Sequence, residues 1–379
     1  MLLTEQLLDT IRQRAATLDK ENAYFTQDLQ DLKEAGYLRA FVPKEFGGFG
    51  LSLDEMVHEQ MALAGAAPAT ALAINMHQVW IGVARSVHSS GDNSMNFVFE
   101  EAVAGEVFAF GVSEAGNDLV MFGSNSVATP CNDGGYAFTG TKIFTSNSPG
   151  WTRLGTFGAH CAQNGETLNV WGFLERSAPG ITVKDDWDTL GMRASQSCTT
   201  VLDGAVARAD RIVRKLPSGA SSDPFIFGIF AHFEVLLAAV YTGIARRALD
   251  VAVGIVHKRM SKATGKPYAQ DPAIRWRIAD AAMELDTVYP LMRMAALDVD
   301  AGVDRGDLWF PQLSNVKSKA TETALSVVEK SVRVSGGSSY FNRSELSRLY
   351  RDVLAGLFHP SDDESVHGAW AQALLGPQD

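Results

Sequence analysis

The sequence predicts an α+β protein in which an N-terminal helical domain, a central antiparallel β domain and a C-terminal four-helix bundle follow one another. Three observations predict this order. Apolar residues recur at helical spacing near the N-terminus, short segments rich in β-branched and aromatic residues follow, and helical spacing then returns. We therefore expect domains at residues 1–105, 106–213 and 214–379.

The N-terminal domain carries two helix-start signals. Ser52 and Glu55 have the spacing of a capping box before a run rich in alanine and methionine. Pro68 is placed to open the next helix, in which Leu72 and Met76 begin an apolar stripe. The two signals predict consecutive helices.

The central domain contains four short segments with strand composition, at residues 107–113, 136–145, 167–175 and 198–206. Turn signals separate them, and this spacing is typical of a compact antiparallel sheet or a small barrel. A linker is predicted at residues 217–224, which are rich in Ser, Gly and Pro. Beyond it, apolar stripes over 235–248, 273–292 and 316–334 predict helices that pack as a bundle.

Composition excludes several classes of partner. The formal charge of -11 comes from dispersed carboxylates without a basic block, so we expect neither nucleic acid nor an anionic membrane surface as a partner. No run of 18 apolar residues predicts a membrane span, and the N-terminus lacks the pattern of a signal peptide. Cys131, Cys161 and Cys198 are far apart and without CxxC spacing, which indicates reduced thiols in a cytoplasmic protein.

The segment 349–360 is the most informative part of the chain. Arg351 and Asp352 lie near the end of a predicted helix, and His359 stands directly before Pro360, where the helix has to stop. A turn that contains Gly336 and Gly337 lies just upstream. Charge, glycine and a positioned histidine in one short stretch indicate a ligand site.

Five local motifs, in this order of helices, strands and helices, resemble the acyl-CoA dehydrogenase superfamily of flavoproteins over essentially the whole chain. They are residues 110–116, residues 140–147, the Leu-Gly-Met-Arg-Ala-Ser segment at 190–195, the helix that ends near Lys258 and Arg259, and the Gly336-Gly337 turn with the Arg351-Asp352 helix after it.

The resemblance implies a flavin site between the β domain and the bundle, with FAD as the cofactor. The positions that contact the flavin in the family are Phe110, Val112, Ser113, Phe144 and Ser146 here, and those that meet the FAD diphosphate of a neighbouring subunit are Arg259, Gly336 and Gly337. A homotetramer or dimer is therefore implied. These residue types fit their roles, because a flavin ring needs an apolar wall and a few hydrogen bonds, and a diphosphate needs close backbone N–H groups and an arginine fork.

One position departs from the family. Family dehydrogenases remove an α-proton with a glutamate placed after the Arg-Asp helix, and Pro360 occupies that position here. A minority of members carry the base on the first bundle helix, where Phe233 aligns and Glu234 follows about 100° around the helix. Glu234 is thus a candidate base if the helix register shifts. The carboxylates at 362–364 follow the proline closely and could place an acidic group near the flavin, although an acidic run after a proline is typical of a solvated helix start.

Two histidines indicate a second interpretation. Some superfamily members are flavin-dependent monooxygenases that lack the glutamate, carry a histidine near the position of His359 and carry another on an N-terminal helix. His77 is the candidate for that second group. A near-neutral pKa lets a histidine exchange protons at pH 7. FMN is then possible in place of FAD. The remaining histidines show no metal-ligand spacing, and no metal site is predicted.

Three function hypotheses follow. The leading one is α,β-dehydrogenation of an acyl thioester on CoA or a carrier protein, with hydride transfer to FAD and electrons leaving through an electron-transfer flavoprotein. The second is a two-component monooxygenase that uses O2 and reduced flavin from a flavin reductase, with a small-molecule substrate. The third is a catalytically silent subunit that stabilises an active paralogue in a mixed tetramer. The absent glutamate weakens the first.

Overall fold

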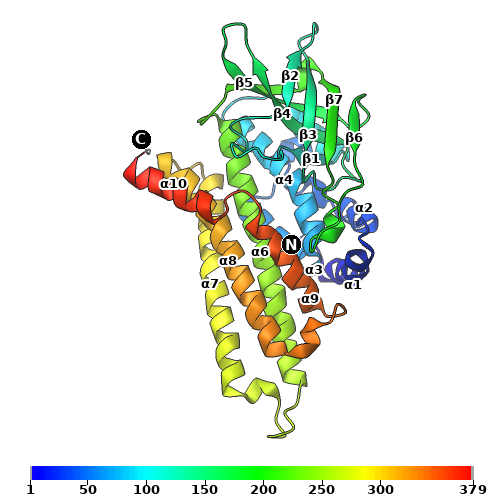
Figure 1. Cartoon of the computed structure of the whole chain (residues 1–379), viewed down its shortest axis with the longest axis vertical. Helices are drawn as coiled ribbons and strands as arrows, with labels where there is room; N and C mark the ends of the chain where they lie inside the picture. Colours follow the sequence, from blue (N-terminus) through cyan, green and yellow to red (C-terminus); the bar gives the residue numbers. More distant parts are fainter. Residues whose placement is uncertain (1, 377–379) are drawn as a thin grey trace.

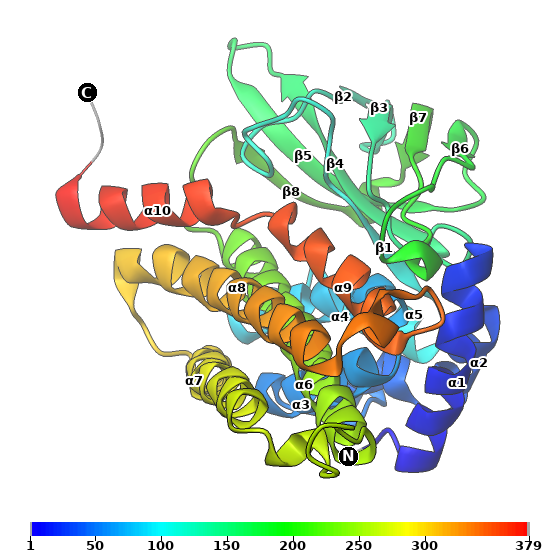
Figure 2. The ribbon, with the colours of Figure 1, turned by 60° about the horizontal axis from the view of Figure 1, so that its bottom comes forward.

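The computed structural model describes residues 2–376, which form an N-terminal group of helices, a sheet and a C-terminal group of helices (Figure 1). The N-terminal helices are α1 (Glu5–Glu21), α2 (Thr26–Glu34), α3 (Leu53–Ala66), α4 (Pro68–Ser89) and α5 (Asn96–Val103). The sheet lies at one end of the molecule, and the long C-terminal helices extend away from it (Figures 1 and 2).

Both predicted helix starts are confirmed. The Ser52 side chain accepts a hydrogen bond from the Glu55 backbone and the Glu55 side chain accepts one from Ser52, so a capping box opens α3. Pro68 is the first residue of α4, where its missing N–H costs no helical hydrogen bond. Helix α4 is buried along most of its length and carries Leu72, Met76 and Trp80 toward the core.

The sheet has eight strands, in the order β6-β7-β3-β2-β4-β5-β8, with β1 paired to β4. The strands are β1 (Phe108–Gly111), β2 (Val127–Pro130), β3 (Tyr136–Lys142), β4 (Arg153–Cys161), β5 (Thr167–Glu175), β6 (Ile181–Val183), β7 (Thr200–Ala207) and β8 (Ile212–Pro217). The prediction of a purely antiparallel sheet is wrong, because β1 and β2 both pair with β4 in parallel. Strand β8 extends past the predicted domain boundary at residue 213, so the β region ends at Pro217.

The predicted strand segments correspond to β1, β3, β5 and β7, so the sequence missed β2, β4, β6 and β8, and the longest of these, β4, was missed for a physical reason. Five consecutive residues of β4 are buried, so the strand lacks the alternation of polar and apolar residues that marks a half-exposed strand. Parallel pairing also joins β1 to a strand about forty residues later, and no local pattern encodes such a long-range pairing.

The C-terminal helices are α6 (Pro224–Lys258), α7 (Pro272–Asp300), α8 (Trp309–Ser335), α9 (Glu345–Val353) and α10 (Asp363–Leu375). The predicted four-helix bundle is confirmed as α6 to α9, with α9 as a short fourth member, whereas α10 projects to one side (Figures 1 and 2). Helix α6 is long and apolar enough to cross a membrane, but 83% of its most apolar window is buried inside the protein, where it packs against α3, α4 and α8. It is the central helix of the core.

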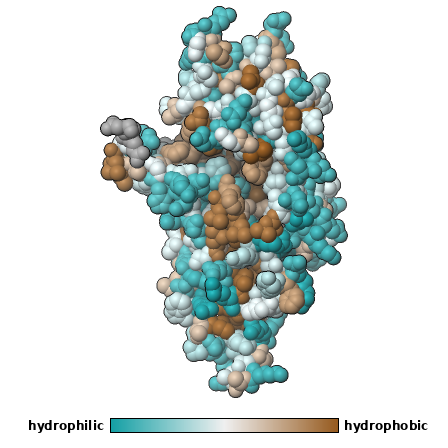
Figure 3. Space-filling model, viewed as in Figure 1, coloured by the Kyte–Doolittle hydropathy of each residue, from teal (hydrophilic) through white to brown (hydrophobic). Residues whose placement is uncertain are grey.

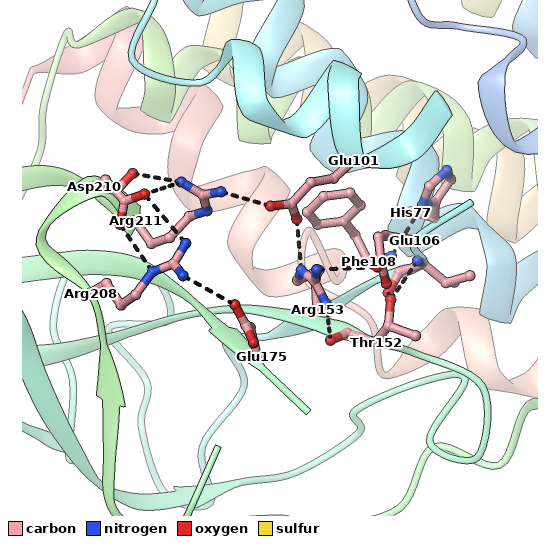
Figure 4. A network of polar contacts seen from close by, with 11 residues as sticks. His77, Glu101, Glu106, Phe108, Thr152, Arg153, Glu175, Arg208, Asp210 and Arg211 are labelled. Carbon is pink, nitrogen blue, oxygen red and sulfur yellow. Dashed lines mark hydrogen bonds and ion pairs between the residues drawn. The ribbon is translucent and has the colours of Figure 1, made fainter. Parts of the chain in front are cut away.

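Ion pairs attach the sheet to the N-terminal helices (Figure 4). Glu101 of α5 accepts from Arg153 of β4 at 2.7 Å and from Arg211, just before β8, at 2.8 Å. One carboxylate thus holds two separate parts of the β region against α5.

Candidate functional site

A cleft lies between the β region, helix α6 and the segment that joins α9 to α10. It has a smaller lobe of about 300 Å³ and a larger lobe of about 610 Å³. Apolar surface gathers in the middle of the face drawn in Figure 3, beside a hollow under the β region. Seven residues line both lobes, so the two form one continuous site: Phe110, Ser113, Phe144, Phe233, Phe358, His359 and Pro360.

The two lobes differ in their remaining walls. The smaller lobe continues to Leu72 and Met76 of α4 and to the 187–192 segment. The larger lobe continues to the 117–122 loop, to Glu234 and to the start of α10. The predicted flavin-contact residues divide between them, since Ser146 lines the smaller lobe and Val112 the larger one.

Phe144 has the geometry of a wall for a planar ligand. Its side chain is 56% exposed although it lies inside the cleft, and its backbone is left-handed at φ 55°. A left-handed phenylalanine is rare and costs about 1–3 kcal/mol, so the surrounding structure has to impose it. An apolar ring held open in a strained backbone is typical of a ligand clamp.

The neighbouring hydroxyl groups differ in how they are engaged. Ser146 Oγ lies 2.8 Å from Ser197 Oγ, which lies 2.8 Å from Ser195 Oγ, so these three form a chain. Within residues 2–376, Ser113 Oγ has no hydrogen-bond partner and faces both lobes. Ser113 is therefore the hydroxyl of this wall that a ligand can engage without breaking an existing hydrogen bond.

A buried ion pair holds this wall in place. Lys142 Nζ lies 2.6 Å from Glu114 Oε1, and the same carboxylate accepts from Ser124, Asn125 and Ser126. Burial raises the pKa of Glu114, but the Lys142 ammonium and these hydrogen bonds outweigh it and lower the pKa to about 2. Burial lowers the pKa of Lys142 to about 8, although Glu114 partly offsets that effect. The pair ties the Ser113 segment to β3, directly before Phe144.

The segment after α9 contributes His359. Its Nδ1 lies 2.8 Å from the hydroxyl of Tyr241 on α6. Burial lowers the pKa of His359, and the nearby Lys317 charge lowers it further, so the imidazole is neutral at pH 7. Burial raises the pKa of Tyr241 well above its ordinary value, so the phenol keeps its proton. In the tautomer in which Tyr241 donates to Nδ1, the imidazole proton lies on Nε2, which has no protein partner in the described chain.

Lys317 holds the segment that carries His359. Its Nζ donates to the carbonyl oxygens of Gly356 at 2.8 Å, His359 at 3.0 Å and Ser361 at 3.2 Å. Ser361 has a left-handed backbone at φ 60°, and its Oγ donates to Glu234 Oε1 at 2.6 Å. One buried ammonium therefore fixes the path of the chain on both sides of Pro360.

Glu234 points into the interior and not into open solvent. It is buried and lines the larger lobe, and its Oε2 has no hydrogen-bond partner among the described residues. Burial raises its pKa, and the Ser361 hydrogen bond and the Lys317 charge only partly offset this. Burial therefore favours the protonated form of the Glu234 carboxyl. Of the acidic residues after Pro360, Asp362 lines the larger lobe and caps α10 by accepting from Ser365 N at 3.0 Å.

The prediction that His77 is a catalytic group is wrong. Its Nδ1 accepts from the backbone N–H of Phe108 at 3.1 Å (Figure 4). Its Nε2 lies 2.7 Å from the carbonyl of Leu38. The ring is fully buried, it lines neither lobe, and burial lowers its pKa to about 4. The two ring nitrogens bond to the backbone of Leu38 and of Phe108, so His77 has no free nitrogen for a ligand.

The residues predicted to meet a diphosphate lie together, but far from the cleft. Arg259 Nη1 donates to the carbonyl of Ser335 at 2.6 Å, and a Cβ on Gly336 would lie 2.5 Å from that same nitrogen. Space beside Gly337 is open. Arg259 follows Phe233 by 26 positions along α6, which is about 39 Å of helix. A ligand in the cleft therefore reaches this cluster only if a second copy of the chain supplies it.

Sequence reasoning missed Tyr241, Lys317, Ser361 and Trp187. Lys317 left a signal, because Leu313, Lys317, Ala320 and Ala324 share the buried stripe of α8 and a lysine there has to find partners. Tyr241 lies inside an apolar stripe and left none. Pairing of Tyr241 with His359 depends on how α6 meets the α9–α10 segment.

Comparison with known proteins gives consistent results. The model of the acyl-CoA dehydrogenase N-terminal domain matches residues 4–93 and that of the acyl-CoA dehydrogenase C-terminal domain matches residues 235–363. YdbM of Bacillus subtilis (strain 168), provisionally described as an acyl-CoA dehydrogenase, is 29% identical over 373 residues, which cover 97% of this chain and 95% of YdbM.

Two further matches concern other chemistry. L-evernosamine nitrososynthase of a Micromonospora species is 27% identical over 362 residues, covering 93% of this chain and 84% of the nitrososynthase. The crystal structure of KijD3 in complex with FMN and dTDP-3-amino-2,3,6-trideoxy-4-keto-3-methyl-D-glucose has a TM-score of 0.88 and 27% identity, with 100% of this chain and 94% of KijD3 covered.

Proposed function

Since the chain belongs to the acyl-CoA dehydrogenase family of flavin-dependent oxidoreductases, we propose that it is a flavin-dependent monooxygenase that receives reduced flavin from a separate reductase. The observation that carries the proposal is the neutral His359, held by Tyr241 at the point where both lobes meet, with Pro360 beside it in the position of the family's glutamate. Among the described residues that line both lobes, His359 offers a hydrogen-bond donor and none is a carboxylate.

The residues of the cleft fit a flavin ring. Phe144 presents an exposed apolar face in a strained backbone, and Ser113 presents an unpaired hydroxyl. Reduced flavin would supply the two electrons that, together with O2, place one oxygen atom on the substrate and release the other as water. Arg259, Gly336 and Gly337 of a second copy would bind the phosphate end of the cofactor, so the proposal includes at least a dimer.

The side chains of this chain would then have distinct roles. His359 Nε2 donates a hydrogen bond into the cleft, because the neutral imidazole keeps its proton on that nitrogen while Nδ1 accepts from Tyr241. Tyr241 fixes the orientation and the tautomer of the ring. Phe110 and Phe233 exclude water from the reacting atoms.

The relatives support oxygen chemistry. The nitrososynthase is named for a product with oxygen on nitrogen, and KijD3 is a protein whose structure contains FMN. We propose FMN or FAD as the cofactor of this chain on the same grounds.

The test is reconstitution with FMN, a flavin reductase and NADH under 18O2. We expect protein-dependent incorporation of one 18O atom into product, and loss of this incorporation in His359→Ala with FMN affinity retained. Anaerobic bleaching of the oxidised flavin band by butyryl-CoA or longer acyl thioesters would contradict the proposal, because it shows hydride transfer from an acyl chain.

One observation favours dehydrogenation as a second candidate. Glu234 lines the larger lobe and keeps one carboxyl oxygen without a hydrogen-bond partner in the described chain. If Glu234 is the base, Glu234→Gln should abolish anaerobic bleaching by a thioester and leave thioester binding intact. A bleaching rate that does not change on this substitution would remove Glu234 from the reaction.

A further inference from the structure

The charges that line the cleft point to the chemistry of its ligand. We infer that the smaller lobe binds an uncharged, apolar ring compound as the substrate, beside a flavin ring at the wall shared by both lobes. This inference rests on the proposed oxygenase function and adds the substrate class and the lobe that binds it.

The smaller lobe offers no free cation to an anionic substrate. Arg351 is its one ionic side chain among the described residues. Its guanidinium already donates to Asp19 Oδ1 at 3.0 Å and to the carbonyl of Leu190 at 2.9 Å, and its second terminal nitrogen pairs with the other oxygen of Asp19. The remaining basic group of the wall, His359, is neutral at pH 7. A carboxylate or phosphate placed here would stay unpaired.

The larger lobe repels anions instead. No lysine or arginine lines it in the part of the chain that the structure describes, whereas Glu114, Asp118, Glu234 and Asp362 do. Glu114 is already neutralised by Lys142, and Asp118 and Asp362 are exposed. An anion in the larger lobe would therefore meet the exposed carboxylates of Asp118 and Asp362, and an anion in the smaller lobe would find no cationic partner among the described residues. A buried charge without a partner is costly to desolvate, so the smaller lobe disfavours an anionic ligand.

The polar groups of the smaller lobe are few and mostly engaged. Ser146 and Ser197 bond to one another, and Thr189 Oγ1 donates to the carbonyl of Gly191 at 2.9 Å. A sugar with many hydroxyl groups would leave most of its donors without acceptors. Ser113 keeps a free hydroxyl, and most of the remaining lining is aromatic or aliphatic, including Leu72, Met76, Phe110, Phe144, Trp187 and Phe233.

Shape supports a ring compound. Phe144 and Trp187 meet edge to face with ring centroids 6.1 Å apart, and Phe110 and Phe233 are 5.7 Å apart. Aromatic ligands gain from such offset and edge contacts beyond the area that they bury. A volume of about 300 Å³ is at the lower end of small-molecule sites and suits a two-ring compound.

The experiment compares three ligands with one ring system and different charge: 1-naphthol, 1-naphthylmethylamine and 1-naphthoate. Binding to the full chain, with and without saturating FMN, is measured by isothermal titration calorimetry at pH 7 in the absence of reductase. We expect 1-naphthol to bind most tightly and 1-naphthoate at least about tenfold more weakly, because only the anion needs a cation. Equal or tighter binding of 1-naphthoate overturns the inference, as does the absence of 1-naphthol binding.

Two leucines of similar exposure, one in each lobe, test which lobe binds the ring compound. Leu190 lines the smaller lobe with 63% of its side chain exposed, and Leu119 lines the larger lobe with 59% exposed. We expect Leu190→Ala to weaken 1-naphthol binding about tenfold, the effect of losing one leucine contact, and Leu119→Ala to leave it unchanged. The opposite result would place the ring in the larger lobe and contradict the inference.

The outcomes separate this inference from the function on which it rests. If none of the ligands that bind becomes labelled with 18O, the oxygenase function is contradicted, whereas the binding preference for an uncharged ring remains supported. Incorporation into anionic ligands alone supports the oxygenase function and overturns the substrate class.

Discussion

Replacement of Lys317 by methionine should loosen the segment that carries His359. The Nζ of Lys317 is the donor to three carbonyl oxygens, those of Gly356, His359 and Ser361, at 2.8, 3.0 and 3.2 Å. Gly356 and Ser361 are buried, so two of these acceptors would lose their partner away from water. Methionine has a similar length and no donor, which makes the change specific to the ammonium.

The magnitude follows from the unpaired acceptors. Each buried carbonyl left without a donor costs about 1–3 kcal/mol, and removal of a buried ammonium returns part of this because that charge no longer has to be desolvated. We expect a loss of about 2–4 kcal/mol in the free energy of unfolding. Lys319→Met is the matched control, because Lys319 is exposed on the same helix and should change stability by less than about 0.5 kcal/mol.

Two measurements check this prediction. Urea unfolding gives the stability of both variants, and NMR of 13C-labelled histidine gives the pKa of His359. Because the Lys317 charge lowers the pKa of His359, Lys317→Met should raise that pKa, whereas Lys319→Met should not. A stability loss below about 1 kcal/mol together with an unchanged His359 pKa would refute the role of Lys317.

Three other predictions test single groups of the site and its support. Tyr241→Phe removes the 2.8 Å hydrogen bond to His359. The turnover number, measured by steady-state oxygen consumption, should fall about five- to tenfold with little change in KM. A change in KM alone would contradict the positioning role of Tyr241. Glu234→Gln should flatten the pH dependence of stability in urea unfolding from pH 5 to 8. The pKa of Glu234 is raised in the folded state, so the native protein retains a proton that the unfolded chain loses. In the wild type, stability therefore falls as pH rises through this window, by at most about 1.4 kcal/mol per pH unit for one proton. The same slope in wild type and variant would show that Glu234 is charged in both states. Lys142→Met leaves the buried Glu114 carboxylate unpaired and should cost about 3–5 kcal/mol in thermal or urea unfolding, whereas Lys215→Met, on the exposed face of β8, should cost less than about 1 kcal/mol. Since the pKa of Glu114 is lowered to about 2, the stabilising effect of the ion pair is present above the ordinary pKa of a glutamate and is lost as the pH falls toward 2. Equal losses of unfolding free energy in Lys142→Met and Lys215→Met would contradict this account.

Local signals predicted the elements that local physics controls. The Ser52–Glu55 capping box, Pro68 at the start of α4 and the stripes of α6, α7 and α8 follow from hydrogen bonds and periodicity within a few turns, and all are confirmed. The parallel pairing of β1 and β2 with β4 joins distant segments, and the sequence predicted an antiparallel sheet instead.

The candidate site divides in the same way. Phe110, Ser113, Phe144, Ser146 and His359 all line one cleft, and Arg259 lies beside Gly336, as the family resemblance implied. The catalytic interpretation of His77 was wrong because a histidine on a buried helix face can satisfy both nitrogens with backbone from other segments. Only packing distinguishes that outcome from a free imidazole.

The sequence by itself indicated the family and the order of helical and β regions, because both are carried by residue identity and local spacing. The tertiary structure decided which groups meet. It paired His359 with Tyr241, tied its segment to Lys317 and buried Glu234 against Ser361. Those contacts set which side chains are charged and which are neutral, since protonation depends on burial and on neighbours more than a hundred residues away or on other helices.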